Sequence, residues 1–471
     1  MPTCVIDGKT VEFTPGENLV EVAKRAGIRI PVFCYHPAMS VVAQCRMCTI
    51  EIKDMPKLQT ACSTAAKDGM VVFTQSDRSV KQQEAVMEFL LVNHPLDCPI
   101  CDKSGECDLQ DFSYDHGSAY MRTTEDRRTY IDLDMGPVIE KNMNRCIHCT
   151  RCIRLGDEIL GIREMVALDR GNRVEITTLD GRPLETNYAG NYADVCPTGS
   201  LTLKDFRFHK RAWMLKKTPT VCEGCSRGCN MEVHHEAGTI YRCLPRANLE
   251  INKHWLCDEG RFNFHYVHSP ERIREPCRKT AEGFEAVTWT DIVSEIRAST
   301  RSGKQAVWVG SDLTLEEMDV AARFAREALG GASIYHFGTE GITTQKDDVD
   351  EDKILRRTSK TSNLAGAERS GLRHYSEMKD KPDTLWVFRG GRAQLPAKIP
   401  GSKLIGFGVF QESEAKAFDY VLAGRSFAEK SGTIINGTGI EQRLERAIEA
   451  PRSTRELMDL VALWKQATAA A

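Results

Sequence analysis

The sequence lacks the features that mark several classes of protein. No apolar run reaches the roughly 18 residues that a membrane-spanning helix needs, and the N-terminus shows no basic segment followed by an apolar one. We therefore expect no membrane span and no signal peptide. Neither sign of charge predominates, since the chain has 63 Lys and Arg and 66 Asp and Glu. This near balance gives no argument for binding nucleic acid or an anionic membrane surface.

Nucleotide-binding signatures are also missing. No Gly-x-Gly-x-x-Gly motif follows a predicted strand, and no P-loop is present, so we expect no nucleotide site in this chain. Cysteine is absent after Cys277, although the chain contains 18 cysteines. In a long chain without a signal peptide, cysteines at C-x2-C spacings indicate metal ligands rather than disulfides, and a reducing compartment such as the cytosol.

Fifteen of the cysteines, together with one histidine, form four sets of four ligands before residue 258. Four mostly thiolate ligands are what one iron–sulfur cluster requires. The remaining Cys4, Cys243 and Cys277 are isolated, and we expect plain thiols there. In chain order, set 1 is Cys34, Cys45, Cys48 and Cys62; set 2 is His94, Cys98, Cys101 and Cys107; set 3 is Cys146, Cys149, Cys152 and Cys196; and set 4 is Cys222, Cys225, Cys229 and Cys257. Four redox centres along one chain predict a path for electrons.

The spacing of the ligands identifies the metal centre more clearly in set 1 than in set 2. Set 1 resembles the plant-type [2Fe–2S] pattern with a longer first gap, whereas zinc loops usually pair two C-x2-C knuckles and set 1 has one. Set 2 suits zinc or a [4Fe–4S] cluster, and spacing alone leaves both open. Pro95 places His94 at a rigid corner that faces the cysteine loop. A neutral imidazole in place of a thiolate removes one negative charge and is expected to raise the reduction potential.

Set 3 carries the strongest pattern. Its C-x2-C-x2-C run with a remote Cys-Pro is the bacterial [4Fe–4S] arrangement. Only one such run exists in the chain, so Cys196 most simply completes its own cluster. In set 4 a predicted hairpin separates the third and fourth cysteines, which favours a compact subdomain around one cluster. A zinc knuckle is the alternative for set 4.

The sequence predicts a multi-domain α/β protein. We expect a helix from Leu19 that ends at Gly27, an amphipathic helix over 80–93 with Val86, Phe89, Leu90 and Leu91 on its apolar side, and hairpins around Asp7-Gly8, Leu179–Arg182 and Ala237-Gly238. The strands expected in the first domain are Thr3–Ile6, Val11–Phe13, Ala43–Ile52 and Val71–Thr74.

Past about residue 272 the pattern becomes βαβ. The strands Ala306–Gly310, Ser333–Phe337, Leu385–Phe388 and Leu404–Phe407 and the helix Thr314–Leu329, with its Thr314-x-x-Glu317 capping box, predict a doubly wound parallel sheet. Residues 345–383 have little apolar content and indicate a linker or flexible insertion. A last helix, capped by Ser453-x-x-Glu456, presents Leu457, Leu460, Val461 and Trp464, and we expect Trp464 to be buried.

The motifs HPLDCPICDKSGECDLQD, RCIHCTRC and ADVCPTGSL, in this order, resemble those of the large iron–sulfur subunit of bacterial respiratory complex I, the proton-pumping NADH:quinone oxidoreductase. The segment Ser426–Asn436 is similar to the C-terminal part of that family. The resemblance implies four domains: a β-grasp [2Fe–2S] ferredoxin domain (1–80), a ferredoxin-like domain with two [4Fe–4S] clusters (81–214), a molybdopterin-oxidoreductase-type [4Fe–4S] subdomain (215–272) and a shortened α/β molybdopterin-oxidoreductase-like domain without a metal centre (273–471).

The same resemblance implies the cofactors and partners. Set 1 would hold a [2Fe–2S] cluster and sets 2, 3 and 4 would each hold a [4Fe–4S] cluster, with set 4 off the main electron path and no molybdenum. Electrons would pass from a flavin subunit that oxidises NADH to quinone-side iron–sulfur subunits, and no residue of this chain would be catalytic. The chain would lie peripherally on the cytoplasmic side of the bacterial inner membrane, as part of a membrane complex.

Three other functions are open to a chain with these cysteines. A relay subunit of an NAD-linked hydrogenase would fit the first three sets, but leaves residues 272–471 without a use. A catalytic molybdenum enzyme, such as an NAD-linked formate dehydrogenase, usually places a Cys, Ser or selenocysteine on the metal well beyond the last cluster, and this chain has no cysteine there. A zinc-binding scaffold without redox function would need four coincidences.

Overall fold

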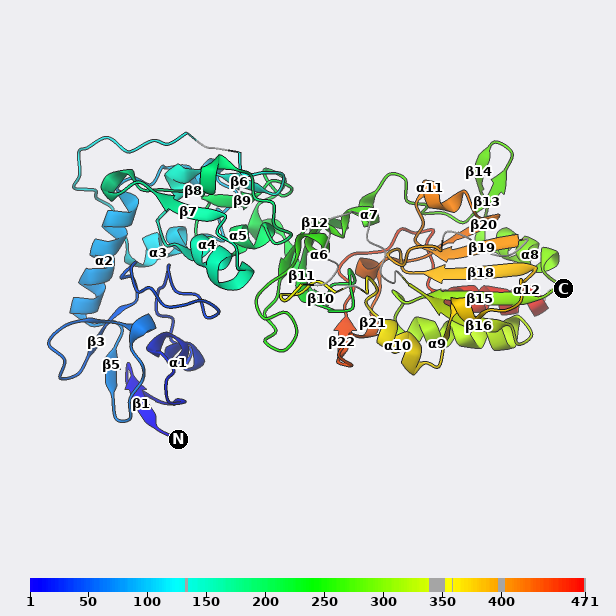
Figure 1. The fold of residues 1–471 in the computed structure, drawn as a ribbon, viewed down its shortest axis with the longest axis horizontal. Helices are drawn as coiled ribbons and strands as arrows, with labels where there is room; N and C mark the ends of the chain where they lie inside the picture. Colours follow the sequence, from blue (N-terminus) through cyan, green and yellow to red (C-terminus); the bar gives the residue numbers. More distant parts are fainter. Residues whose placement is uncertain (132–133, 339–351, 358, 397–402, 470–471) are drawn as a thin grey trace. The chain divides into compact units, whose positions relative to one another are not determined.

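The computed structural model describes residues 1–131, 134–338, 352–357, 359–396 and 403–469. The chain divides into two compact units, Met1–Leu215 and Lys216–Ala471 (Figure 1). Within the described ranges, no helix is both long enough and apolar enough to cross a membrane.

The first unit begins with a mixed five-stranded sheet in the order β2-β1-β5-β3-β4. The predicted hairpin at Asp7-Gly8 is confirmed, because both residues adopt the positive φ that a tight turn requires. Helix α1 (Leu19–Arg25) packs its apolar side against this sheet, and Asn18 caps it by accepting from the N–H groups of Val20 and Glu21. The strands are β1 (Thr3–Ile6), β2 (Lys9–Glu12), β3 (Thr49–Ile52), β4 (Gln59–Thr60) and β5 (Val71–Phe73).

The predicted strand Ala43–Ile52 is wrong in its first half. Only Thr49–Ile52 forms a strand, because Ala43 and Arg46 have positive φ values of 49° and 60° that turn the backbone away from an extended path. These turns wrap the loop that carries three cysteines of set 1.

Short elements surround sets 2 and 3 in the rest of the first unit. Helix α2 (Asp77–Leu91) overlaps the helix predicted over 80–93, but it starts three residues earlier and ends two residues earlier. Its buried stripe runs through Ser79, Gln83 and Val86, and Phe89 is 80% exposed. The expectation that Phe89 lies on the buried side is therefore wrong. The other elements are α3 (Asp108–His116), α4 (Arg151–Arg154), α5 (Gly190–Val195), β6 (Ile139–Lys141), β7 (Met165–Leu168), β8 (Glu175–Thr178) and β9 (Leu201–Leu203).

The hairpin expected around Leu179–Arg182 is not formed there. The antiparallel partners β7 and β8 are joined through residues 169–174, and the Leu179–Gly181 turn follows β8. Asp180 and Gly181 do have the positive φ of a turn, but Pro183 comes next and has no N–H for a strand ladder.

The second unit opens with a small antiparallel sheet, β10-β11-β12, that frames set 4. The predicted hairpin at Ala237-Gly238 is confirmed and joins β11 to β12. The elements of this part are β10 (Lys216–Val221), β11 (Asn230–Glu236), β12 (Thr239–Pro245), α6 (Asp258–Phe262) and α7 (His265–His268).

The core of the second unit is an eight-stranded sheet in the order β14-β13-β20-β19-β18-β15-β16-β17 (Figure 1). The six strands from β20 to β17 run parallel, whereas the β13–β14 hairpin joins the β20 edge antiparallel. The four predicted strands are all present at its centre. The strands are β13 (Cys277–Thr280), β14 (Gly283–Ala286), β15 (Gln305–Gly310), β16 (Ser333–Phe337), β17 (Arg373–His374), β18 (Thr384–Arg389), β19 (Lys403–Gly408) and β20 (Tyr420–Ala423).

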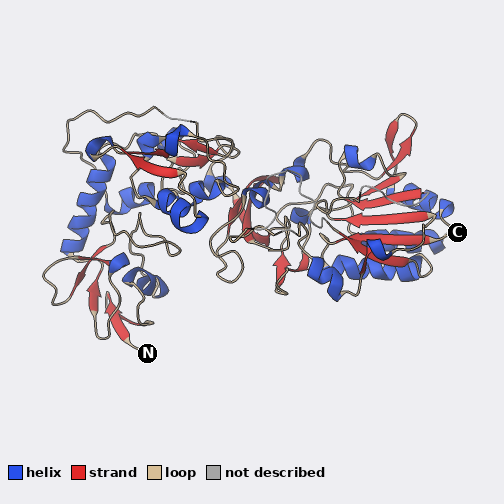
Figure 2. Ribbon diagram, in the orientation of Figure 1, coloured by secondary structure: helices blue, strands red, loops and turns tan. Residues whose placement is uncertain are grey.

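Side chains on both faces of this sheet are buried, but the cover differs between the faces. Helices α8 (Trp289–Ser299), α9 (Leu315–Arg323) and α12 (Leu457–Ala469) pack on the face that Val307 and Val309 present (Figure 2). On the face of Trp308, the described cover is short α11 (Glu412–Ala415) with loops. The doubly wound arrangement is therefore only partly present among the described residues. The predicted capping box of Thr314 and Glu317 is confirmed at the start of α9.

The charged segment 345–383 is not a linker where the structure describes it. Residues 345–351 lie outside the described residues, but Leu355 and Asn363 are buried, and Asn363 donates to the carbonyl of Leu313 at 2.8 Å. Hydrogen bonds from polar side chains thus replace the apolar contacts that the composition lacks. The remaining elements are α10 (Leu364–Arg369), β21 (Gly432–Ile435) and β22 (Glu441–Leu444).

The last helix, α12, begins later than predicted. It starts at Leu457, and the N–H of Glu456 donates to the carboxylate of Asp459. The expected cap Ser453 instead accepts the indole N–H of Trp289 through its carbonyl, at 2.6 Å. The burial of Trp464 is confirmed, since it is 5% exposed.

We expect Trp464→Ala to lower the free energy of unfolding by about 3–5 kcal/mol. The indole of Trp464 packs edge-on against Phe324 and Trp386 with ring centroids 5.5 Å apart in each pair, so its removal leaves a cavity. Denaturant unfolding measures the change. Met458→Ala is the matched control, because Met458 lies on the same helix and is 59% exposed, and its effect should stay within about 0.5 kcal/mol. Equal effects of the two changes would contradict the packing.

Candidate metal centres

The four thiols of set 1 lie together beside the N-terminal sheet. Cys34, Cys48 and Cys62 are 1% exposed, and the thiols form two hydrogen-bonded pairs, Cys34 with Cys45 and Cys48 with Cys62. The hydrogen bond from Cys45, aided by backbone N–H groups, lowers the pKa of Cys34 to about 5. This hydrogen bond favours the thiolate, the form that binds metal, at Cys34, and it raises the pKa of its partner Cys45.

Set 3 encloses a small cavity. Cys146, Cys149, Cys152 and Cys196 all line a space of about 20 Å³, together with apolar side chains such as that of Met165. The first three come from the turn before α4 and from α4 itself, and Cys196 follows α5. Burial raises the pKa of Cys149 to about 11. Four thiols held apart around a small space with mostly apolar walls match the ligand shell of a cubane cluster.

Backbone turns shape the loop of set 3. His148 and Thr150 have positive φ values of 53° and 59°, and they curl the chain between the cysteines. The N–H of His148 then points at the sulfur of Cys146, 3.4 Å away. Hydrogen bonds to sulfur are one means by which a protein tunes a cluster's potential.

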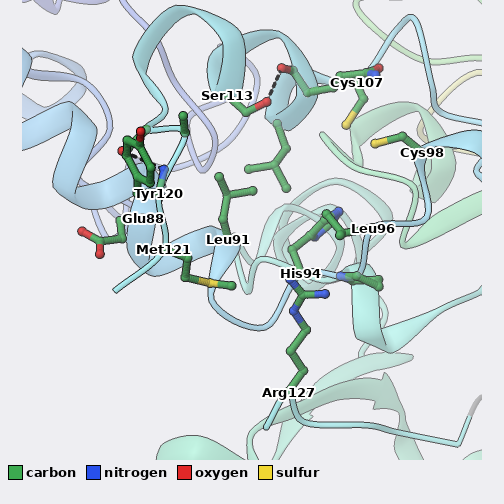
Figure 3. A pocket seen from close by; sticks show the side chains of 15 residues that line it. Glu88, Leu91, His94, Leu96, Cys98, Cys107, Ser113, Tyr120, Met121 and Arg127 are labelled. Carbon is green, nitrogen blue, oxygen red and sulfur yellow. Dashed lines mark hydrogen bonds between the residues drawn. The ribbon is translucent and has the colours of Figure 1, made fainter. Parts of the chain in front are cut away.

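Set 2 surrounds a larger pocket of about 310 Å³ (Figure 3). His94, Cys98 and Cys107 line it, together with apolar residues such as Leu91. His94 follows α2, and Cys107 immediately precedes α3. Cys101 does not line this pocket. Its sulfur lies instead where a side chain at Gly199 would be, 2.1 Å from that ideal Cβ position, so the structure gathers three of the four predicted ligands around one space.

His94 has the electrostatic state of a ligand. Burial lowers the pKa of its imidazole to about 4, so the ring is neutral near pH 7 and has a lone pair to offer. Its Nδ1 atom is buried and accepts no hydrogen bond from any described residue. A buried polar atom without a partner costs free energy, and a bound metal would satisfy it.

The thiols of set 4 are clustered in the second unit. Cys222 follows β10, Cys229 precedes β11 and Cys257 precedes α6, and burial raises the pKa of all four thiols, including Cys225. The N–H groups of Gly224 and Gly260 donate to Cys222 and Cys257 at 3.4 and 3.3 Å. A Cβ at Gly260 would lie 2.9 Å from the sulfur of Cys222, so glycine is what lets the backbone approach the sulfurs.

The donor sets fit iron–sulfur clusters. All eighteen cysteines are free thiols, and sets 1, 3 and 4 each gather four of them. Cys4, Cys243 and Cys277 lie in strands and are buried.

One hydrophobic core joins the first three sets, and sequence reasoning missed it. The core contains cysteines of set 1, set 2 and set 3, and we call it the shared core. Its buried members are Phe33, Cys34, Met47, Val86, Met87, Cys107, Leu109, Phe112, Ile147 and Cys149. Side chains that are far apart in the sequence meet here, so no local spacing could have revealed it.

Two buried arginines of α4 were also missed. Arg151 donates to the carbonyls of Tyr35 and Val195, and Arg154 donates to those of Cys34, Ser40 and Cys149. Both guanidinium groups thus reach from the loop of set 3 to the loop of set 1. The only sequence signal was their position next to Cys152.

In the second unit, the carboxyl ends of β15 and β18 meet where the strand order reverses, which is the usual ligand crevice of a parallel sheet. Here the carboxylate of Asp312 accepts from the N–H groups of Gly390, Arg392 and Ala393 at 2.7–3.0 Å. Asp312 is 4% exposed. These N–H groups are therefore already engaged by an internal anion and are not available to a phosphate.

Family models match four stretches of the chain, one for each ligand set. A 2Fe-2S iron-sulfur cluster binding domain covers 2–77, and an NADH-ubiquinone oxidoreductase-G iron-sulfur binding region covers 83–122. The ferredoxin-like domain of NADH-quinone oxidoreductase subunit 3 covers 136–202, and a molybdopterin oxidoreductase Fe4S4 domain covers 215–269.

Individual relatives agree with these matches. The chain is 35% identical over 382 residues to the NADH-ubiquinone oxidoreductase 75 kDa subunit of Reclinomonas americana, covering 79% of this chain and 55% of that protein. It is 39% identical over 346 residues to the NADH-quinone oxidoreductase G-type subunit of Rickettsia felis, covering 72% and 51%. The chain thus spans about half the length of the curated relatives it matches.

A solved structure of an NAD+-reducing [NiFe]-hydrogenase contains a chain that is 30% identical to this one. The match covers 44% of this chain and 90% of that chain, with a TM-score of 0.40. A score this low does not establish a shared fold.

We expect Asp312→Ala to lower the free energy of unfolding by about 2–4 kcal/mol, because three buried N–H groups lose their acceptor. Chemical denaturation measures the loss. Asp319→Ala removes an exposed carboxylate from the nearby helix α9 and should change the free energy by no more than about 0.5 kcal/mol. Wild-type stability of the Asp312 variant would show that these bonds are not what closes the crevice.

Proposed function

Because the chain belongs to the family of the large iron–sulfur subunit of NADH:quinone oxidoreductase, also called the 75 kDa subunit, we propose that it relays single electrons. The electrons would enter from a flavin subunit that oxidises NADH and leave toward a quinone-side iron–sulfur subunit. The observation that carries this proposal is the shared core, which contains cysteines of sets 1, 2 and 3.

The proposed ligands are the members of the four sets. Cys34, Cys45, Cys48 and Cys62 would bind one [2Fe–2S] cluster, and each of the other sets would bind one [4Fe–4S] cluster. Such clusters accept and return one electron at a time. The paired thiols of set 1, the thiol-lined cavity of set 3 and the neutral imidazole of His94 support this assignment.

Set 4 would stand apart from this relay. Its cysteines lie in the second unit, and the shared core includes none of them. The second unit would serve as a platform for neighbouring subunits, with no molybdenum. The carboxylate of Asp312 supports this reading, because it engages the N–H groups that a phosphate-bearing cofactor would use at the carboxyl ends of β15 and β18.

The proposed partners are other subunits of the same enzyme. A relay needs a flavin subunit on one side and an iron–sulfur subunit on the other, and neither nucleic acid nor NADH would bind this chain. We place it on the cytoplasmic side of a bacterial inner membrane, held there by its partners. Unaided binding of the isolated chain to liposomes would contradict this indirect attachment.

Metal analysis of anaerobically purified protein tests the assignment. Four clusters predict about 14 iron atoms and 14 sulfides per chain, with little zinc and no molybdenum. About 10 iron atoms would mean that one cubane site is empty or holds zinc. Stoichiometric molybdenum would overturn the relay and make the chain a catalytic subunit.

Replacing the histidine of set 2 tests the ligand roles. In His94→Cys a thiolate takes the place of the neutral imidazole, and the added negative charge should lower the reduction potential of that cluster alone. An anaerobic redox titration followed by electron paramagnetic resonance (EPR) measures the shift. His209→Cys is the control, since it adds a cysteine at an exposed position outside all four sets. An unchanged potential in His94→Cys would remove His94 from the ligands.

A further inference from the structure

Arg154 lies between the ligand loops of sets 1 and 3, and no sequence motif predicts this position. Its Nη1 atom donates to the carbonyl of Ser40 at 2.6 Å, and its Nη2 atom donates to the carbonyl of Cys34 and, at 3.5 Å, to that of Cys149. One guanidinium therefore connects the residue carrying a set 1 thiol with the residue carrying a set 3 thiol. Arg154 is 6% exposed.

The charge of Arg154 has no carboxylate partner. Among the described residues, no Asp or Glu oxygen lies within 4.0 Å of its guanidinium, in contrast to other buried arginines such as Arg272, which pairs with Glu429. Glu158 is near in sequence, but its two oxygens accept the N–H and the hydroxyl of Ser40. The Nε atom of Arg154 is buried and has no hydrogen-bond acceptor among the described residues.

A buried cation without a counter-ion is costly, by several kcal/mol. The carbonyl oxygens that its guanidinium contacts belong to Ser40, Cys34 and Cys149, and two of these residues are proposed cluster ligands. Four thiolates around two or four irons carry a net negative charge, which increases by one unit when the cluster accepts an electron. Reduced clusters at sets 1 and 3 would therefore be the counter-charge that the protein itself does not supply.

We propose that Arg154 is a positioning residue of the relay that serves two clusters at once. Its charge stabilises the reduced form of the cluster at set 1 and that of the cluster at set 3, and its fork of donors fixes the two ligand loops against each other. The transfer itself moves one electron from the reduced cluster to its oxidised neighbour, with no proton and no further reactant. This inference rests on the proposed assignment of sets 1 and 3 as cluster ligands.

The shape of the side chain explains why arginine suits this place. Donors in a planar fork reach three carbonyl oxygens on two loops, whereas the single ammonium of lysine is a point charge. Arg151 is less well isolated from carboxylates, because its charge also acts on the half-buried carboxyl of Asp108. Arg154 is thus the clearer of the two to test.

The test is an anaerobic redox titration of the whole chain, with EPR signals of the set 1 and set 3 clusters recorded separately. Arg154→Gln removes the charge and keeps a hydrogen-bond donor. At a fixed solution potential, the ratio of reduced to oxidised cluster should fall roughly tenfold at both sets, which is about 59 mV for a one-electron couple. Arg154→Lys keeps the charge and should restore most of both potentials.

The control is Arg163→Gln, which removes a positive charge whose side chain is 85% exposed, a short distance along the same chain segment. It should leave both ratios unchanged, because solvent screens an exposed charge. Unshifted potentials in Arg154→Gln, or a shift of only one cluster, would overturn the shared role.

Iron and sulfide content distinguishes the remaining outcomes. If Arg154→Gln loses iron while Arg154→Lys keeps the full content and both potentials, a cation is required at this point and the proposal stands. If both variants lose iron equally, the fork of hydrogen bonds matters and the charge does not, which contradicts the proposed stabilisation of the two reduced clusters. Absence of both EPR signals from the wild-type chain would instead refute the proposed function on which the inference rests.

Discussion

The structure of the first unit depends on one constraint: soft, negatively charged ligands must be gathered inside a protein interior. Burial alone raises the pKa of most of these thiols, as at Cys149 and Cys107, and so opposes the thiolate form. Hydrogen bonds to sulfur and buried guanidinium groups act in the opposite direction. Positive φ values turn the loops of sets 1 and 3 so that N–H groups and sulfurs face the same points. They occur at Ala43, Arg46, His148 and Thr150.

The shared core connects the first three ligand sets within one packed region. Residues of three ligand sets pack within it, and the guanidinium of Arg154 contacts the loops of two of them. The second unit is stabilised differently, by a large buried sheet. Its parallel sheet is buried on both faces, yet the crevice at its carboxyl edge is closed by the carboxylate of Asp312. At this edge of the sheet the chain therefore hydrogen-bonds to itself.

The local sequence pattern correctly predicted the elements that local interactions determine. The hairpins at Asp7-Gly8 and Ala237-Gly238, the cap at Thr314 and the central strands of the large sheet follow from turn chemistry and apolar periodicity. The misses at Phe89 and in the polar segment after residue 352 have a common cause, since distant partners decided both, whereas Pro183 decided the Leu179 turn locally. The ligands could be predicted from their spacing in the sequence. The roles of Arg154 and Asp312 could not, because these residues act through contacts 78 to 120 positions away.

The most direct test of the shared core is the magnetic interaction between the clusters that it would hold. The spin-relaxation rate of the set 1 signal should be measured by pulsed EPR in anaerobic samples poised above and below the potential of the set 3 cluster. Packing in one core predicts that the set 1 signal relaxes faster once the set 3 cluster is reduced and paramagnetic. A relaxation rate that does not change between the two poised states would contradict a relay built through this core.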